Sequence, residues 1–171
     1  MRAMPLTVSV LAAAVLLTAC NGGGGTSGSK NSSACAIGTV SVQVGAASVA
    51  PSAGDTGEIP VSITNQSAPC TLDHFPGVTL EQQGVSAKLS AQKGAKAQKL
   101  KLAKGDSATF TITYVRGKEG DPGSLAATAM KVSLPGSDTV QSFPWKYGPV
   151  AGQVGRSHPN ASVSAFQQVG D

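Results

Sequence analysis

Hydrophobic and polar residues alternate with a period of two along much of the chain after residue 39. Such alternation is typical of β-strands that bury one face. It is most regular at residues 108–114, where Ala, Phe, Ile and Tyr alternate with three threonines. The pattern predicts strands at residues 40–44, 58–65, 77–83, 85–90, 100–102, 108–114, 130–134 and 140–147, with a further edge strand around Ala161–Phe166.

Turn-forming residues separate these strands at intervals of about ten residues. No apolar residues recur at helical spacing over three turns after the first twenty residues. Seven or eight short strands without intervening helices predict an all-β fold, an antiparallel β-sandwich. An up-and-down barrel is the alternative, because periodicity does not report whether a sheet closes. Pro144 places the last regular strand at a sheet edge, since proline cannot donate to a ladder.

Residues 65–77 form a corner between two predicted strands, and the rest of the chain is organised around it. The corner contains Cys70, two prolines and a Pro-Gly turn signal. Alternating residues precede it at 59–64 and follow it at 78–81. Phe75 is available within the corner to fill the core of the sandwich.

The first twenty residues predict an export signal. Arg2 supplies a positive charge, and the apolar run at 6–17 is shorter than a membrane-spanning helix requires. Leu-Thr-Ala-Cys at residues 17–20 resembles a bacterial lipobox, in which the cysteine receives a diacylglycerol before cleavage. An ordinary secretory signal that contains a cysteine is the alternative. Because two acyl chains, such as palmitate, suffice for stable anchoring, we expect Cys20 to hold the protein at the extracytoplasmic face of the bacterial cell membrane.

The remaining chain divides by composition. Residues 21–34 are rich in Gly, Ser and Asn and predict a flexible tether. We expect one folded β-sandwich domain at residues 35–171, with its core at 35–148 and a weakly structured tail after residue 149.

Cys35 and Cys70 are the cysteines that remain once Cys20 is assigned to lipid. An even pair in an exported protein predicts one disulfide, which would join the start of the domain to the corner. A redox-active or metal-binding pair is the alternative. Against it, the two cysteines lack C-x-x-C spacing, and the chain has only two histidines.

The corner motif Asn-x-Ser-x-x-Cys-Thr-Leu-x-x-Phe-Pro-Gly-Val at residues 65–78, with Cys35 ahead of it, resembles domain of unknown function 4232 of actinobacterial secreted proteins and lipoproteins. Leu-x-x-Gly-x-Ser-Ala at 102–108 and Leu-Pro-Gly at 134–136 support the resemblance, which covers roughly residues 35–148. It implies an immunoglobulin-like β-sandwich. Many relatives carry a second cysteine pair that this chain lacks. The family has no established activity, so the resemblance assigns no catalytic residue.

Charge is sparse, but lysine is concentrated in one segment. The net charge is +4, and six of the ten lysines lie between residues 88 and 104. Aromatic residues are absent among them, which argues against stacking recognition of nucleic acid. The cluster either protects a strand edge from pairing or contacts anionic polymers of the cell envelope. We expect the strand pair at 86–90 and 100–102 to present Lys88, Lys99 and Lys101, and the joining loop to present Lys93 and Lys96. The candidate binding residues are Lys88, Lys93, Lys96, Lys99, Lys101 and Lys104.

The remaining candidates for chemistry are weak. His74 lies beside Asp73, but no nucleophile stands in a recognisable setting, so a turn histidine is the favoured interpretation. No ligand cluster for a metal and no cofactor motif is present in the sequence. We therefore expect a non-enzymatic, lipid-anchored module that binds an anionic polymer or a protein of the envelope, without a cofactor or nucleic acid. A hydrolase or enzyme accessory domain with an unrecognised site, or an extracytoplasmic metal-handling protein, is the alternative.

Overall fold

The computed structural model describes residues 33–169. The predicted signal at 1–20, Cys20 and all but the end of the tether therefore lie outside the described residues. Within that range the chain forms strands, turns and loops, and twelve strands are present. Between residues 33 and 169 no helix is long and apolar enough to span a membrane.

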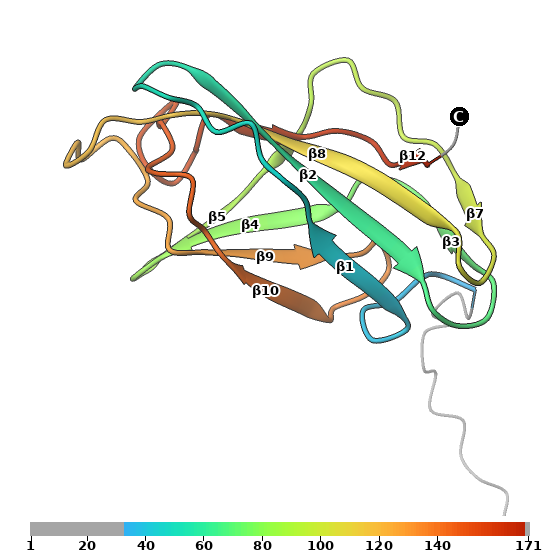
Figure 1. Cartoon of the computed structure of the whole chain (residues 1–171). Coiled ribbons are helices and arrows are strands. Elements are labelled where there is room, and N and C mark those ends of the chain that lie inside the picture. Colours follow the sequence, from blue (N-terminus) through green and yellow to red (C-terminus); the bar gives the residue numbers. More distant parts are fainter. Residues whose placement is uncertain (1–32, 170–171) are drawn as a thin grey trace, which may run out of the picture.

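The larger sheet has six strands, with β2 and β8 at its centre (Figure 1). These two long strands pair antiparallel from Thr56 opposite Val115 to Thr64 opposite Ser107. The order is β1-β2-β8-β11-β6, and β12 also pairs with β8. The bounds are β1 (Val40–Val44), β2 (Thr56–Asn65), β6 (Ser90–Ala91), β8 (Ser107–Val115), β11 (Ala161–Val163) and β12 (Gln167–Gln168).

The second sheet has four antiparallel strands in the order β10-β9-β4-β5, and it faces the larger sheet (Figure 1). Its strands are β4 (Gly77–Gln82), β5 (Val85–Lys88), β9 (Ala129–Ser133) and β10 (Val140–Pro144). A third, two-stranded ladder joins β3 (Cys70–Leu72) to β7 (Leu100–Leu102) at one end. The predicted all-β sandwich is confirmed, and the sheets do not close into a barrel.

The core lies between the two sheets, where the inward residues of each strand meet. Along β8, buried and half-buried residues alternate without interruption, as the sequence pattern predicts. Tyr114, Phe110 and Phe166 are the largest fully buried side chains. The rings of Phe110 and Phe166 meet edge to face with their centroids 5.7 Å apart, an arrangement favoured by the aromatic quadrupole.

The tail predicted to be weakly structured after residue 149 is instead part of the sandwich. Val150 and Phe166 are fully buried. The strand expected at an edge is β11, which pairs with β8 on one side and with β6 on the other. It is an inner strand because the short β6, contributed by a distant part of the chain, covers its outer side. Pairing partners of this kind leave no periodic signal in the sequence.

The predicted strand at residues 85–90 is two strands in different sheets. β5 ends at Lys88, and the chain crosses to the larger sheet, where β6 begins at Ser90. Leu89 lies buried at the crossing, and its N–H donates to the carbonyl of Val78 at 2.8 Å. The alternation continues through the crossing because Ala87 and Leu89 both face the same core.

Two further expectations need correction. Phe75 does not fill the core: it is only half-buried, and its neighbour Pro76 is buried instead. The last regular strand ends at Pro144 rather than at residue 147. Pro144 cannot donate a ladder bond, and β10 is an edge strand as its proline predicts.

Candidate functional site

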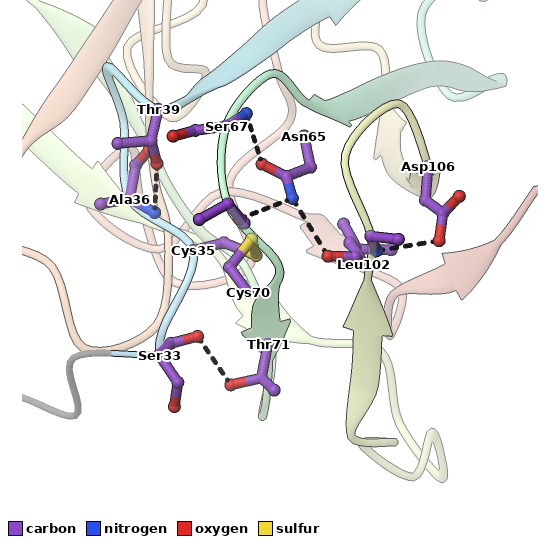
Figure 2. The surroundings of a disulfide bond; sticks show 12 residues. Ser33, Cys35, Ala36, Thr39, Asn65, Ser67, Cys70, Thr71, Leu102 and Asp106 are labelled. Carbon is purple, nitrogen blue, oxygen red and sulfur yellow. Dashed lines mark hydrogen bonds between the residues drawn. A yellow bond between two sulfur atoms is a disulfide. The ribbon is translucent and has the colours of Figure 1, made fainter.

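Asn65, the last residue of β2, holds the corner together. Its side chain is buried, and its Nδ2 donates hydrogen bonds to the carbonyls of Ala68 and Leu102, each at 3.0 Å. Its Oδ1 accepts from the Ser67 N–H at 3.0 Å (Figure 2). A buried amide without partners would cost about 1–3 kcal/mol. Asn65 is thus a structural residue that connects the corner to β7.

The disulfide lies beside this amide (Figure 2). The sulfur atoms of Cys35 and Cys70 are 2.06 Å apart, and both residues are buried. The Cys35 N–H donates to the Thr71 carbonyl at 2.9 Å, and the Thr71 N–H donates to the Ser33 carbonyl at 2.7 Å. The predicted bridge is confirmed, and it joins the start of the domain to the corner in the predicted way.

His74 lies in the corner but faces solvent. Its φ of 65° places it in the left-handed region, which is uncommon for residues other than glycine. Its N–H donates to Oδ1 of Asp73 at 2.9 Å, and its side chain is 81 % exposed. The geometry is that of a turn histidine, which is the favoured interpretation of the sequence.

The six candidate lysines are all exposed. The strand pair expected to present them does not form, because β5 pairs with β4 and β7 pairs with β3. The reason is that the disulfide-linked corner itself supplies β3, a strand that the alternation at 70–72 is too short to reveal. In Figure 1 the yellow-green segment that connects β5 to β7 arches away from the two sheets. The lysines are therefore distributed along a connection rather than on one ladder.

Two of these lysines, Lys88 and Lys93, line a cleft of about 350 Å³ beside β6, β8 and β11 of the larger sheet. His158 lines the same cleft from the connection that precedes β11. The cleft has no carboxylate side chain among its lining residues, which are Thr56, Lys88, Ser90, Ala91, Lys93, Thr113, Tyr114, Val115, Gln153, His158, Pro159, Asn160, Ala161 and Ser162. The other four candidate lysines lie outside it.

The floor of the cleft is a row of hydroxyl groups. Ser162 is directly opposite Ser90 on one side and Thr113 on the other. Residues opposite one another on paired strands point to the same face, and the inward face here belongs to Ala161, Val163 and the neighbouring core residues. The three hydroxyl side chains therefore point outward into the cleft.

Backbone hydrogen bonds fix the wall that carries His158. The Gln153 N–H donates to the His158 carbonyl at 2.8 Å, and the His158 N–H donates to Gly155 at 3.1 Å. Asn160 connects this turn to β8, because the Val115 N–H donates to its carbonyl at 2.9 Å. The expectation of a weakly structured tail after residue 149 gives no reason to place His158 beside the lysines. The alternating Ala-Ser-Val at 161–163 was the only signal that the tail returns to the sheet.

An aromatic cluster fills the same end of the core. The rings of Tyr114 and Trp145 have centroids 5.3 Å apart, and those of Trp145 and Tyr147 are 4.9 Å apart. The Tyr114 hydroxyl accepts from the Ala50 N–H at 3.3 Å and donates to the Tyr147 carbonyl at 3.1 Å. Gly57 makes room for the Tyr114 ring, since a Cβ there would lie 2.5 Å from Cε1. The Tyr114 hydroxyl and the Trp145 indole N–H both donate to backbone carbonyls, and Tyr114 also lines the cleft.

A search of residues 33–169 finds no group of three or more His, Cys, Asp or Glu side chains that could hold a metal ion. Residues 35–167 match the model of the family described as domain of unknown function (DUF4232). The chain belongs to this family, and the match extends through β11 and Phe166, beyond the limit of the sequence resemblance. No curated protein matches the chain.

Proposed function

We propose that this chain is a non-catalytic, lipid-anchored module of the bacterial cell envelope that binds anionic envelope polymers. The single observation that carries the proposal is the charge of the segment between Glu81 and Asp106. It contains six lysines and no acidic residue. All six lysine side chains are exposed, and none forms a salt bridge with another described residue.

The arrangement supports binding through long-range charge rather than through shape. The lysines extend from the end of β5, through the connection to β7, to the turn that follows β7. A Debye length of about 10 Å at 0.1 M salt lets neighbouring lysines act together on one polymer. The lipobox and the short tether would hold this surface close to the membrane and to the inner wall layer.

Binding to isolated cell wall at increasing salt tests the proposal. Affinity should fall steeply between 0.1 and 1 M salt, as the Debye length shrinks to about 3 Å. A variant with Lys96→Glu, Lys99→Glu and Lys101→Glu should lose binding without unfolding, because these positions are exposed.

The matched control is Lys118→Glu, Lys146→Glu and Arg156→Glu, which makes the same charge change at exposed positions outside the segment. The control should weaken binding far less than the first variant. Equal losses in the two variants would show that only the net charge matters. Salt-independent binding would contradict the proposal.

The anchoring part of the proposal rests on the motif at residues 17–20. The mature protein should partition into detergent and carry diacylglycerol on Cys20, and Cys20→Ala should abolish both properties. Intact-mass spectrometry of the protein from membranes checks this. An unmodified Cys20 on a freely secreted protein would contradict it.

A further inference from the structure

In the cleft beside β11 of the larger sheet, lysine side chains lie near hydroxyl groups that are held on paired strands. The rest of the lysine segment at 88–104 does not have this combination. Lys88, Lys93 and His158 all line the cleft. The row formed by Ser90, Ser162 and Thr113 crosses its floor. The other four lysines of the segment at 88–104 lie outside the cleft and therefore away from this row of hydroxyl groups. They are Lys96, Lys99, Lys101 and Lys104.

The hydroxyl row is available for a ligand. The side chains of Ser90, Ser162 and Thr113 make no hydrogen bond to another residue in the described part of the chain. Backbone ladders hold all three in place, because each belongs to a paired strand. A hydroxyl both donates and accepts, so a row of three matches a ligand that presents several hydroxyl groups of its own.

The cations of the cleft suit a phosphate. Lysine binds phosphate as a compact point charge, without the planar fork through which arginine binds carboxylates and phosphates. The cleft has two lysines and no arginine among its lining residues. Absence of carboxylates from the lining leaves the positive charge of Lys88 and Lys93 uncompensated there.

The cleft does not suit a nucleobase. Base recognition in single strands depends on stacking against exposed aromatic faces. Tyr114 is the one aromatic residue of the lining, and its side chain is fully buried in the core against Trp145. A ligand here meets hydroxyls, an imidazole and ammonium groups instead.

We propose that this cleft binds a polyol phosphate, with the phosphate between Lys88 and Lys93 and the polyol hydroxyls on the Ser90–Ser162–Thr113 row. His158 would contact the ligand from the wall opposite the floor. The inference rests on the proposed function and narrows it to one class of polymer, poly(polyol phosphate), and to one site. A volume of about 350 Å³ is within the range of ordinary small-molecule sites, so it holds a short stretch of such a polymer.

Calorimetric titration of the lipidated full chain in detergent tests the site with three probes. The probes are a synthetic oligomer of glycerol phosphate, inorganic polyphosphate of equal charge, and glycerol alone. Glycerol phosphate should bind tightest, because it alone uses both the cations and the hydroxyl row. Glycerol should not bind measurably, and polyphosphate should bind more weakly than the glycerol phosphate oligomer.

Two pairs of variants separate the charges from the hydroxyls. Lys88→Gln with Lys93→Gln should weaken binding of both phosphate probes by about tenfold or more, the loss of at least one charge-assisted contact. Thr113→Val with Ser162→Ala should weaken only the glycerol phosphate oligomer, by about tenfold for two lost hydrogen bonds. The matched control, Lys118→Gln with Lys146→Gln, lies at exposed positions outside both the cleft and the segment at 88–104. It should change either affinity by less than about threefold, because screened charges outside the site contribute little.

The outcomes distinguish this site from the wider proposal. If the hydroxyl variant binds glycerol phosphate normally, or if the control variant loses as much affinity as Lys88→Gln with Lys93→Gln, the cleft is not the site, while charge-based binding of polymers stands. If neither phosphate probe binds the unaltered protein, and isolated cell wall does not bind either, both proposals fail. Thermal unfolding of each variant verifies that the fold is retained.

Discussion

The side-chain amide of Asn65 donates a 3.0 Å hydrogen bond to the backbone carbonyl of Leu102, and through it the end of β2 is connected to β7. The backbone repeats the connection next to it: the Asn65 N–H donates to Asp106, and the Gly105 N–H donates to the Asn65 carbonyl. Asn65 thus joins the long central strand to the turn that leads into β8. The disulfide-linked corner at residues 65–77 begins at this same residue (Figure 2).

Replacement of Asn65 by alanine should lower the free energy of unfolding by about 2–4 kcal/mol. Three hydrogen bonds to buried or half-buried groups are lost, and the Leu102 carbonyl is left without its side-chain donor. Urea unfolding measures the change. Gln66→Ala is the control, because Gln66 is exposed and should alter stability by less than about 0.5 kcal/mol. A similar small change in both variants would refute the structural role of Asn65.

Removal of the disulfide by Cys35→Ser with Cys70→Ser should destabilise the domain. The bridge closes a loop with a sequence separation of 35 residues, for which the chain-entropy model gives about 4 kcal/mol. The double variant should melt well below the oxidised native chain and close to the reduced native chain, and thermal unfolding of all three checks this. Two free thiols per folded molecule in the oxidised protein would contradict the bridge.

Stability should fall at alkaline pH through Tyr147. Burial, and then the charge of the neighbouring Tyr114, raise the pKa of Tyr147 above its ordinary value of 10.0. The folded protein therefore holds this proton more tightly than the unfolded chain does. Its contribution to stability is complete below the unfolded pKa and is lost as the pH rises through the folded pKa.

Tyr147→Phe cannot ionise, so this variant should lose less stability than the native chain as the pH rises above about 10. Urea unfolding at several pH values measures the difference. Identical pH profiles for the native chain and the variant would show that Tyr147 titrates alike in the folded and unfolded states.

The left-handed backbone at His74 predicts an unusual pattern of substitutions. His74→Gly should leave stability unchanged or raise it by up to about 1 kcal/mol, because glycine adopts this conformation without steric cost. His74→Val should lower stability by about 1–2 kcal/mol, since a β-branched residue is disfavoured there. Thermal unfolding of both variants tests this. If valine were tolerated as well as glycine, the turn would not depend on this conformation.

The period-two alternation by itself determined that the chain is all-β, because burial of one strand face imposes that pattern wherever the strand lies. That the sheets form a sandwich and not a closed barrel was decided by the tertiary structure. The corner was readable because its prolines and its Pro-Gly turn act locally and need no distant partner. Cys35 and Cys70 could be paired because no other cysteine lies in the region that matches the family.

Only the tertiary structure decided which strands are neighbours. Alternation states which side chains of a strand are buried, but not which strand pairs with it. The crossing at Leu89 therefore left no signal of its own, and the alternation at 161–163 indicated a strand without showing that it lies between β8 and β6. The cleft depends on those pairings, since Lys88, Thr113 and Ser162 lie far apart in the sequence and share a site only through them. Exposed lysines carry no periodic constraint, so the alternation could not tell which two of the six stand over a row of hydroxyl groups.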